Sequence, residues 1–251
     1  MNMKVVFNAD DFGYSKGANF GIVEAYQNGP VRSTTIMAGM PGFDHAVGLA
    51  KENPGLKIGV HLTLSTGKSV GGVYHTLTDE DGKFLPLVEV ERRVDAGKID
   101  LVEVEAEYEA QIKKVIAAGI KPDHFDSHHH THDLPGVAAS FMKIARKYGV
   151  KARLYNRDLP QGEYEAIGST DAFDEAFYDD TATLADLRRM ISGHKVGSLE
   201  IMCHPAYVDH EIYSSSSYNV KRAYELYVLT SPETMAFFAE QGVELCSFSD
   251  L

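Results

Sequence analysis

Short runs of β-branched and other apolar residues alternate along this chain with longer segments in which apolar residues recur at helical spacing. Such alternation is typical of βα units arranged around a parallel sheet. We predict strands at residues 4–8, 34–38, 57–64, 124–127, 151–154, 199–203 and 244–248. We predict helices at residues 16–27, 44–52, 101–118, 137–148, 184–192, 220–229 and 232–241. Ser15 and Gly149 are the predicted cap residues of the first and fourth of these helices.

The chain has 251 residues, a length that one (β/α) barrel commonly fills. No internal repeat and no low-complexity linker divides it, so we expect a single domain over residues 1–251. Seven strands with intervening helices favour an α/β fold of the distorted (β/α) barrel type, and an open doubly wound sheet is the alternative. In both architectures the chemistry gathers at the carboxyl ends of the strands.

Two segments lack helical or strand periodicity. Residues 65–86 are rich in glycine, threonine and aspartate, and residues 156–183 combine aromatic residues with many acids. We interpret both as long irregular segments, which in compact domains are often functional.

Acidic residues outnumber basic residues by 36 to 24, which gives a formal net charge of −12. A charge of this sign repels phosphate backbones and anionic lipid, so neither nucleic acid nor a membrane is an expected partner. The first residues contain no apolar signal segment, and no run of about 18 apolar residues occurs. The two cysteines, Cys203 and Cys246, are too few for a disulfide framework. These features predict a cytoplasmic protein.

Histidines are concentrated directly after the predicted strand 124–127. Four of the eleven fall within five residues, at His128, His129, His130 and His132. If the extended geometry of the strand continues, Asp126 projects to the same side as His128, His130 and His132. A set of exposed loop histidines is the simpler alternative, but crowded imidazoles repel one another on protonation unless something binds them.

Other polar residues also end predicted strands. Asp10 and Asp11 follow the first strand and point in different directions, so one can bind a metal ion while the other accepts a proton. His61 closes the third strand and His204, before Pro205, ends the sixth. Each has a simpler explanation when taken alone, namely a helix cap for an aspartate and a hydrogen-bonded core group for a histidine.

The coincidence of these positions favours a metal site, because the carboxyl ends of strands converge in a barrel. Two histidines and one acid are a common ligand set for a hydrolytic divalent metal ion, and they leave positions open for water and substrate. A Ser-His-Asp nucleophile is less favoured because the chain has no G-x-S-x-G segment. Cys203 is interpreted as a core cysteine rather than a thiol nucleophile, because neighbours on a strand face opposite sides.

Four motifs carry a resemblance to a known family. VVFNADDFG at residues 5–13, GVHLTL at 59–64, DSHHHTH at 126–132 and EIMCHP at 200–205 resemble those of the YdjC-like carbohydrate deacetylases, most closely the members that act on chitooligosaccharides. The resemblance runs nearly end to end and is weakest in the two irregular segments, which leaves the length and identity of the sugar open. It implies a distorted (β/α) barrel, one divalent metal ion, with Mg²⁺ or Zn²⁺ favoured, and removal of N-acetyl groups from short N-acetylglucosamine oligosaccharides.

The resemblance also implies a role for each of the strand-end residues. Asp11, His61 and His128 would be the metal ligands. Asp10 would be the general base that activates water, and His204 the general acid that protonates the departing amine.

Further residues of the motifs would contact the substrate. His130 and His132 belong to the family's histidine pattern, and we expect both to bind the sugar. Arg153 would contact either the substrate or a carboxylate, with a surface arginine as the alternative. The expected partner is a small acetylated oligosaccharide. Barrels of this type often pair, so a homodimer is an open alternative to a monomer.

Two other functions use similar residues. A metal-dependent phosphoesterase could employ the same aspartates and histidines, but the sequence places no cluster of arginine or lysine beside them, and the net charge repels anionic substrates. A non-catalytic sugar-binding protein would need metal ligands but no additional base or acid. Asp10 and His204 would supply such a base and acid, so they argue against this function.

Overall fold

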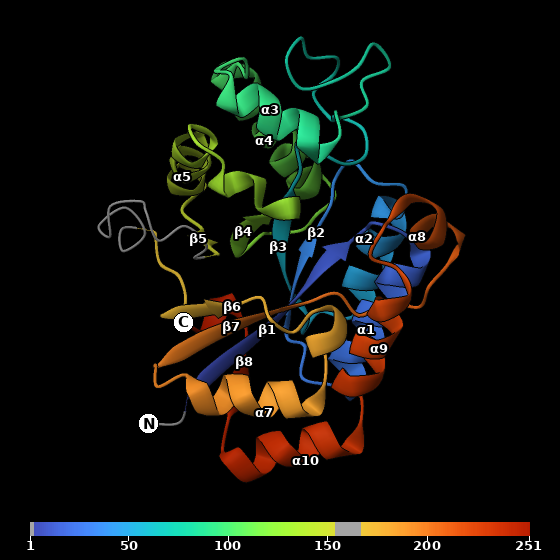
Figure 1. Ribbon diagram of the computed structural model, residues 1–251, viewed down its shortest axis with the longest axis vertical. Helices are drawn as coiled ribbons and strands as arrows, with labels where there is room; N and C mark the ends of the chain where they lie inside the picture. Colours follow the sequence, from blue (N-terminus) through green and yellow to red (C-terminus); the bar gives the residue numbers. More distant parts are fainter. Residues whose placement is uncertain (1–2, 154–166) are drawn as a thin grey trace.

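The computed structural model describes residues 3–153 and 167–251, and its strands form one curved parallel sheet (Figure 1). The strand order is β5-β4-β3-β2-β1-β7-β6, with β8 paired to β1. The strands are β1 (Lys4–Phe12), β2 (Ser33–Ile36), β3 (Lys57–Leu62), β4 (His124–Ser127), β5 (Lys151–Ala152), β6 (Ala172–Asp174), β7 (Ser198–Cys203) and β8 (Glu244–Cys246).

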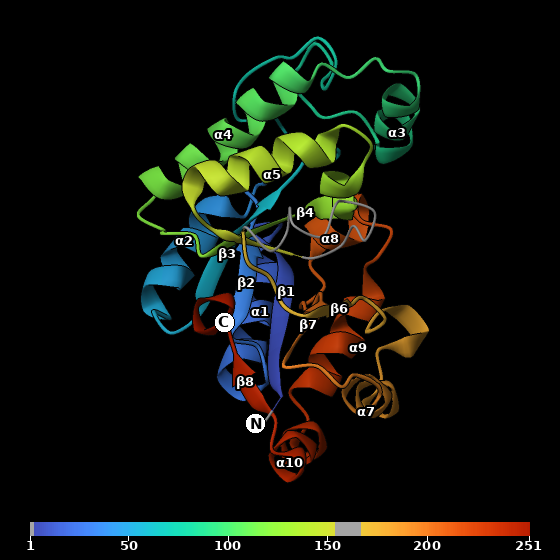
Figure 2. The same ribbon diagram turned by 90° about the vertical axis from the view of Figure 1, so that its left-hand side faces the viewer.

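Helices surround the sheet on its outside, as Figures 1 and 2 show from two directions. The α-helices are α1 (Lys16–Asn28), α2 (Phe43–Glu52), α3 (Leu87–Asp95), α4 (Leu101–Ala117), α5 (Val137–Tyr148), α7 (Leu184–Gly193), α8 (His210–Ser215), α9 (Val220–Leu229) and α10 (Pro232–Gln241). Three short 3₁₀ segments are η1 (His128–Asp133), η2 (Asp179–Thr181) and η3 (Phe248–Asp250).

Strand β1 lies at the centre of the sheet and pairs with three other strands. β8 pairs with its first residues and β2 with its last ones, while β7 follows most of its length in parallel. Among the described residues no strand pairing joins β5 to β6, so the curl stays open on that side. The predicted distorted (β/α) barrel is therefore confirmed, with one strand more than the seven expected.

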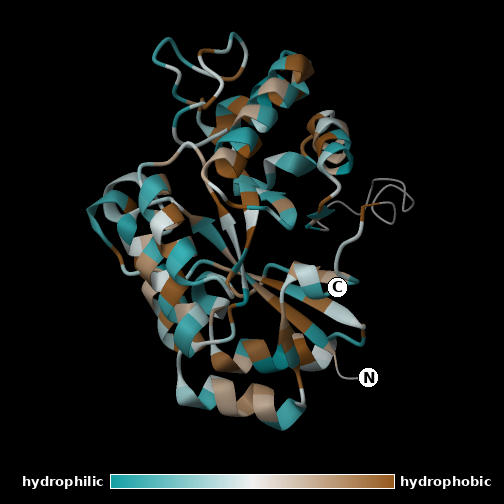
Figure 3. Ribbon diagram, turned by 180° about the vertical axis from the view of Figure 1, so that it is seen from behind, coloured by the Kyte–Doolittle hydropathy of each residue, from teal (hydrophilic) through white to brown (hydrophobic). Residues whose placement is uncertain are grey.

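The strands at the centre of the sheet are buried on both faces. All residues of β2 and β7 are buried, and in β1 only Lys4 is partly exposed. Figure 3 shows hydrophobic residues along the central strands and a mixture of hydrophobic and hydrophilic residues along the surrounding helices. This is the pattern of a parallel sheet covered by helices, and it leaves the strand ends as the place where polar groups gather. Cys203 belongs to this core, as predicted.

The predicted cap residues are confirmed. The Ser15 hydroxyl accepts a hydrogen bond from the backbone N–H of Ala18 at 3.1 Å, and Gly149 ends α5 in a left-handed conformation with φ of 63°.

Apart from the three 3₁₀ segments, the elements of the described residues that were not predicted are α3, α8 and β6. β6 lies within the segment 156–183 that was interpreted as irregular, and its three residues are too few to display a period. Leu154 and residues 156–166 of the predictions lie outside the described part of the chain. No helix in the described ranges is long and apolar enough to cross a membrane.

Candidate active site

A cavity of about 840 Å³ opens at the carboxyl ends of β1, β3, β4 and β7, within the range of about 300–1,000 Å³ that small-molecule sites occupy. It is lined by the five residues for which metal or catalytic roles are predicted: Asp10, Asp11, His61, His128 and His204. The structure thus brings together residues that are separated by almost 200 positions in the sequence. Their roles remain predictions that the geometry makes testable.

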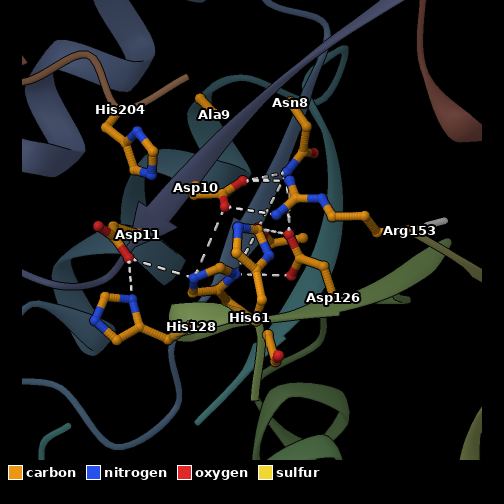
Figure 4. Close-up of polar contacts among 12 residues, drawn as sticks. Asn8, Ala9, Asp10, Asp11, His61, Asp126, His128, Arg153 and His204 are labelled. Atoms are coloured by element: carbon orange, nitrogen blue, oxygen red, sulfur yellow. Dashed lines mark hydrogen bonds and ion pairs between the residues drawn. The ribbon is translucent and has the colours of Figure 1, made fainter. Parts of the chain in front are cut away.

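Asp10 and Asp11 both reach the cavity because β1 contains one extra residue. Between Ala9 and Phe12 the register with β2 shifts by one residue, and Asp11 adopts a left-handed φ of 70°. Such a bulge redirects a side chain that would otherwise point away from its neighbour. Two adjacent carboxylates consequently enter the same site from slightly different directions (Figure 4).

Asp11, His61 and His128 form a group that can hold a metal ion. One ligand atom from each lies within 4.8 Å of the others. The Nδ1 atom of His128 is 2.9 Å from Oδ1 of Asp11, and Nε2 of His61 is 3.4 Å from the same oxygen. The three side chains are almost completely buried, and two imidazoles with one carboxylate suit a divalent cation.

His61 is oriented for this role by Asp126. Its Nδ1 atom is 2.7 Å from Oδ1 of Asp126, which directs Nε2 toward Asp11. Metal-binding histidines commonly contact a carboxylate through their second nitrogen in this way. Burial lowers the pKa of His61, but Asp126 and Asp10 outweigh this effect and raise the pKa to about 10. Without a cation the imidazole is therefore protonated, and a metal ion would have to displace that proton.

A second group of potential ligands combines Asp10, His61 and Asp126. The guanidinium of Arg153 contacts both oxygens of Asp10 and also approaches Asp126 at 3.0 Å. Both carboxylates of this group contact Arg153, whereas the single carboxylate of the first group, Asp11, contacts Arg222. The group containing Asp11 is the better candidate because it presents two imidazole nitrogens in addition to a carboxylate oxygen.

Asp10 accepts three hydrogen bonds from two residues. Arg153 donates from Nη1 and Nη2 at 2.7 and 2.6 Å, and Nδ2 of Asn8 donates to Oδ1 at 2.8 Å. Burial raises the pKa of Asp10, but the charge and hydrogen bonds of Arg153 are stronger and hold the pKa well below its usual value. Asp10 is consequently ionised, as a proton acceptor must be.

His204 faces the same cavity from the end of β7. Its backbone N–H donates to Oε2 of Glu225, and its Nδ1 atom is 3.6 Å from Oε1 of that carboxylate. Glu225 is completely buried in α9. The second ring nitrogen, Nε2, is therefore the one available to a ligand in the cavity.

The histidine segment does not continue the strand, which corrects our expectation of its geometry. β4 ends at Ser127, and His129 and His130 adopt left-handed φ values of 55° and 51°. The alternation of sides is lost, so Asp126, His128, His130 and His132 do not share one side. Residues with left-handed backbone conformation cannot extend a strand. In this arrangement His128 contacts Asp11, and Asp126 contacts Nδ1 of His61.

The three residues for which substrate contact was predicted, His130, His132 and Arg153, differ in burial and in whether they line the cavity. His130 lines the cavity, with its Nε2 atom 3.4 Å from Glu175. His132 is 1% exposed and bonds to the Ser127 hydroxyl, and Arg153 is completely buried. Neither of these two lines the cavity. Arg153 contacts Asp10, Asp126 and Glu200, so the carboxylate alternative is confirmed and the surface alternative is wrong.

Sequence reasoning missed two charged residues of α9 that support the site. Nη2 of Arg222 is 2.8 Å from Oδ2 of Asp11, and Glu225 contacts His204. Both lie on the buried face of the helix together with Leu226 and Leu229. Their spacing of three residues on an otherwise apolar helix face is the signal that could have identified them.

This chain is similar to known proteins along most of its length. The model of the YdjC-like protein family matches residues 4–240. A carbohydrate deacetylase of Listeria welshimeri is 43% identical over 99% of this chain and all of its own length, and one of Brevibacillus brevis is 40% identical over the same shares.

Solved structures are also similar. A crystal structure from Enterococcus faecalis V583, whose name proposes cellobiose-phosphate cleavage, is 33% identical, has a TM-score of 0.89 and covers 100% of this chain and 99% of its own. A family 4 carbohydrate esterase of Streptomyces lividans shares the fold alone, with 13% identity and a TM-score of 0.52 over 98% of this chain and 92% of its own. The sequence matches extend almost from end to end, and we conclude that the chain belongs to the YdjC-like family.

Proposed function

We propose that this protein is a carbohydrate deacetylase that uses one divalent cation to hydrolyse the N-acetyl group of short N-acetylglucosamine oligosaccharides or related acetylated sugars. The observation that carries the proposal is the arrangement of an ionised carboxylate, Asp10, and an imidazole, His204, on one cavity with the group formed by Asp11, His61 and His128. The relatives at about 40% identity are named for deacetylation of carbohydrates.

An acetamide is a poor electrophile, and its amine is a poor leaving group. Its hydrolysis therefore requires an activated water molecule, stabilisation of charge on the carbonyl oxygen and a proton for the nitrogen. A divalent cation bound by Asp11, His61 and His128 would polarise the carbonyl and lower the pKa of a water molecule. Asp10 is a weak base because Arg153 lowers its pKa. It can therefore accept a proton only from a water molecule whose own pKa is lowered, as a bound cation would do.

Asp10 accepts the proton of the attacking water in this mechanism. Its carboxylate is fixed by Arg153 and Asn8, so it keeps its orientation as the proton moves. His204 protonates the departing amine from Nε2, because Nδ1 faces Glu225. Each group therefore performs one proton transfer, and the two lie on the same cavity.

The charge of the cavity supports a neutral substrate. Besides Asp10 and Asp11, its wall carries Glu175, Asp179 and Asp180. The guanidinium of Arg222 is already paired with Asp11. A phosphorylated sugar, as the name of the Enterococcus faecalis neighbour suggests for that protein, would bring a dianion to a wall of like charge.

The experiment that tests the proposal is a comparison of products. Purified protein, metal-free and then supplied with Mg²⁺, Zn²⁺, Mn²⁺ or Co²⁺, is incubated with mono-, di- and trisaccharides of N-acetylglucosamine, and acetate is measured. Phosphate release from cellobiose phosphate is measured in parallel. We expect metal-dependent acetate release that is greatest with the oligosaccharides. Phosphate release without acetate would establish the phosphoesterase alternative, and metal and sugar binding without any product would establish a binding protein.

We further propose that the enzyme acts in the cytoplasm on a soluble sugar, without nucleic acid or membrane. Two observations support this proposal: the net charge of −12, and two cysteines that are both buried and unbridged. A homodimer remains a proposal for which light scattering is the direct test.

A further inference from the structure

We propose that Tyr178, supported from one side by the stacked ring of Tyr218, forms an aromatic platform on which the pyranose ring of the acetylated sugar stacks. The inference rests on the proposed function, and it assigns a sugar-binding surface to residues outside the metal and proton-transfer groups. Both tyrosines line the cavity that contains Asp10 and His204.

The two rings are stacked beside His204. Their centroids are 3.9 Å apart and their planes differ by 15°. His204 meets both at nearly right angles, with centroid distances of 5.6 Å to Tyr178 and 5.7 Å to Tyr218. A sugar that places its nitrogen at His204 therefore has its ring within reach of the aromatic pair.

The pair is held in place by its surroundings. The Tyr218 hydroxyl donates to Glu225 and accepts a hydrogen bond from the backbone N–H of Asp179 at 3.0 Å. Asp179 has a left-handed φ of 53°, and Lys221 pairs with Asp179 and Asp180. These contacts fix the position of Tyr218 beside Tyr178.

The exposure of Tyr178 points to a ligand of mixed character. One face of its ring covers Tyr218, yet 39% of the residue remains accessible at the wall of the cavity. The face of an aromatic ring carries partial negative charge and attracts the polarised C–H groups of a pyranose. Ser215, Ser216 and Ser217 line the same cavity and add polar character to the wall beside the ring.

Binding without turnover is the direct test. N-acetylglucosamine and its disaccharide are titrated calorimetrically into the full chain carrying Asp10→Asn, alone and together with Tyr178→Ala or Tyr178→Phe. We expect Tyr178→Ala to weaken sugar binding about tenfold and Tyr178→Phe to have little effect, because the ring face rather than the hydroxyl makes the contact. Equal affinity of the alanine variant, equal losses in both variants, or no sugar binding by the parent protein would overturn the platform.

Kinetics separate this proposal from the proposed function. With Asp10 intact, Tyr178→Ala should raise KM for the sugar and leave kcat nearly unchanged, since stacking is equal in the ground and transition states. Tyr213→Ala is the matched control, because Tyr213 is also an exposed tyrosine but does not line the cavity. Failure of the parent protein to release acetate contradicts the proposed function, whereas acetate release with an unchanged KM in Tyr178→Ala contradicts only the platform.

Discussion

The guanidinium of Arg153 binds both carboxylate oxygens of Asp10, with Nη1 2.7 Å from Oδ2 and Nη2 2.6 Å from Oδ1. Its Nε atom donates to Glu200 at 2.8 Å, and Asp126 lies 3.0 Å from Nη2. One buried cation therefore compensates carboxylates from β1, β4 and β7 at once. Bidentate contacts of this kind fix orientation as well as charge, so Arg153 determines where the oxygens of Asp10 point.

The first prediction concerns the shape of this cation. In Arg153→Lys the charge stays but the planar fork is lost, so Asp10 should lose its fixed orientation. We expect kcat to fall at least about tenfold, while metal content stays equal to that of the parent. Arg153→Ala leaves buried carboxylates without their partner and should lower the free energy of unfolding by about 3–5 kcal/mol. Chemical denaturation and acetate release are the measurements.

The control for this prediction is Arg92→Lys, which alters an exposed arginine paired with Glu89 on α3. Such surface pairs contribute little, so activity and stability should stay close to those of the parent. An Arg153→Lys protein with full kcat would show that the bidentate contact does not serve catalysis.

The second prediction concerns metal binding. His61→Ala and His128→Ala each remove one nitrogen of the candidate group, and each should reduce bound metal far below one ion per chain and abolish acetate release. Bound metal is measured by elemental analysis after gel filtration. His210→Ala, which alters an exposed histidine away from the cavity, should retain full metal and activity. Stoichiometric metal in both His61→Ala and His128→Ala would refute the assignment.

The positions of these candidate ligands could be predicted from the sequence because the prediction requires only the order of the strands and their parallel pairing. His61 and Asp11 end strands that a parallel sheet must bring together, and the strand pattern was sufficient to place them. The bulge at Asp11 and the left-handed turn at His129 are local backbone events that no periodicity encodes. The structure brings the expected residues to one cavity, whereas the turn at His129 explains why the histidines after β4 do not share one side as expected.

Arg153 illustrates what the sequence could not reveal. A single arginine after a strand can contact a substrate or a carboxylate or lie at the surface, and the choice depends on Asp10, Asp126 and Glu200, which lie on three other strands. For Glu225 the apolar face of α9 signals a buried charge, but its partner, His204 at the end of β7, is visible only in the fold. Long-range charge compensation becomes visible only when the register of the sheet is known.

The third prediction concerns pH. Asp126 and Asp10 raise the pKa of His61 to about 10 against the effect of burial, so the metal-free protein keeps His61 protonated at neutral pH. Only the neutral imidazole binds a metal ion, and each bound ion should release about one proton. Metal affinity should consequently increase about tenfold per pH unit between about pH 6.5 and 8.5.

Calorimetry in buffers of different ionisation enthalpy measures the released protons directly. Asp126→Asn removes the charge that favours the protonated ring, so less proton release is expected from that variant near neutral pH. In the metal-free protein the same raised pKa stabilises the fold below the ordinary pKa of histidine, and this contribution is lost as the pH rises toward about 10. An affinity independent of pH would show that His61 is not a ligand.

The fourth prediction separates the roles of the two neighbouring aspartates. Asp10→Asn keeps the shape of the side chain but cannot accept a proton, so it should retain metal and lose about 100- to 10,000-fold in kcat. Asp11→Asn should instead lose metal, because Asp11 provides the carboxylate of the candidate group. Elemental analysis and acetate release on the same samples distinguish the two effects. Loss of metal from Asp10→Asn would support the alternative group with Asp126 and exchange the roles.

The last prediction assigns the leaving-group proton to His204. The departing amine of a sugar amide must be protonated, whereas the nitrophenolate of 4-nitrophenyl acetate leaves as an anion. His204→Ala should therefore be severely slowed on the acetylated sugar and much less on the ester, while Asp10→Asn should be slowed on both because each reaction needs an activated water. His204→Gln tests whether a neutral donor of similar size restores the sugar reaction, and we expect that it does not. Equal losses of His204→Ala on amide and ester would contradict the acid role and leave His204 as a residue that positions the substrate beside Tyr178.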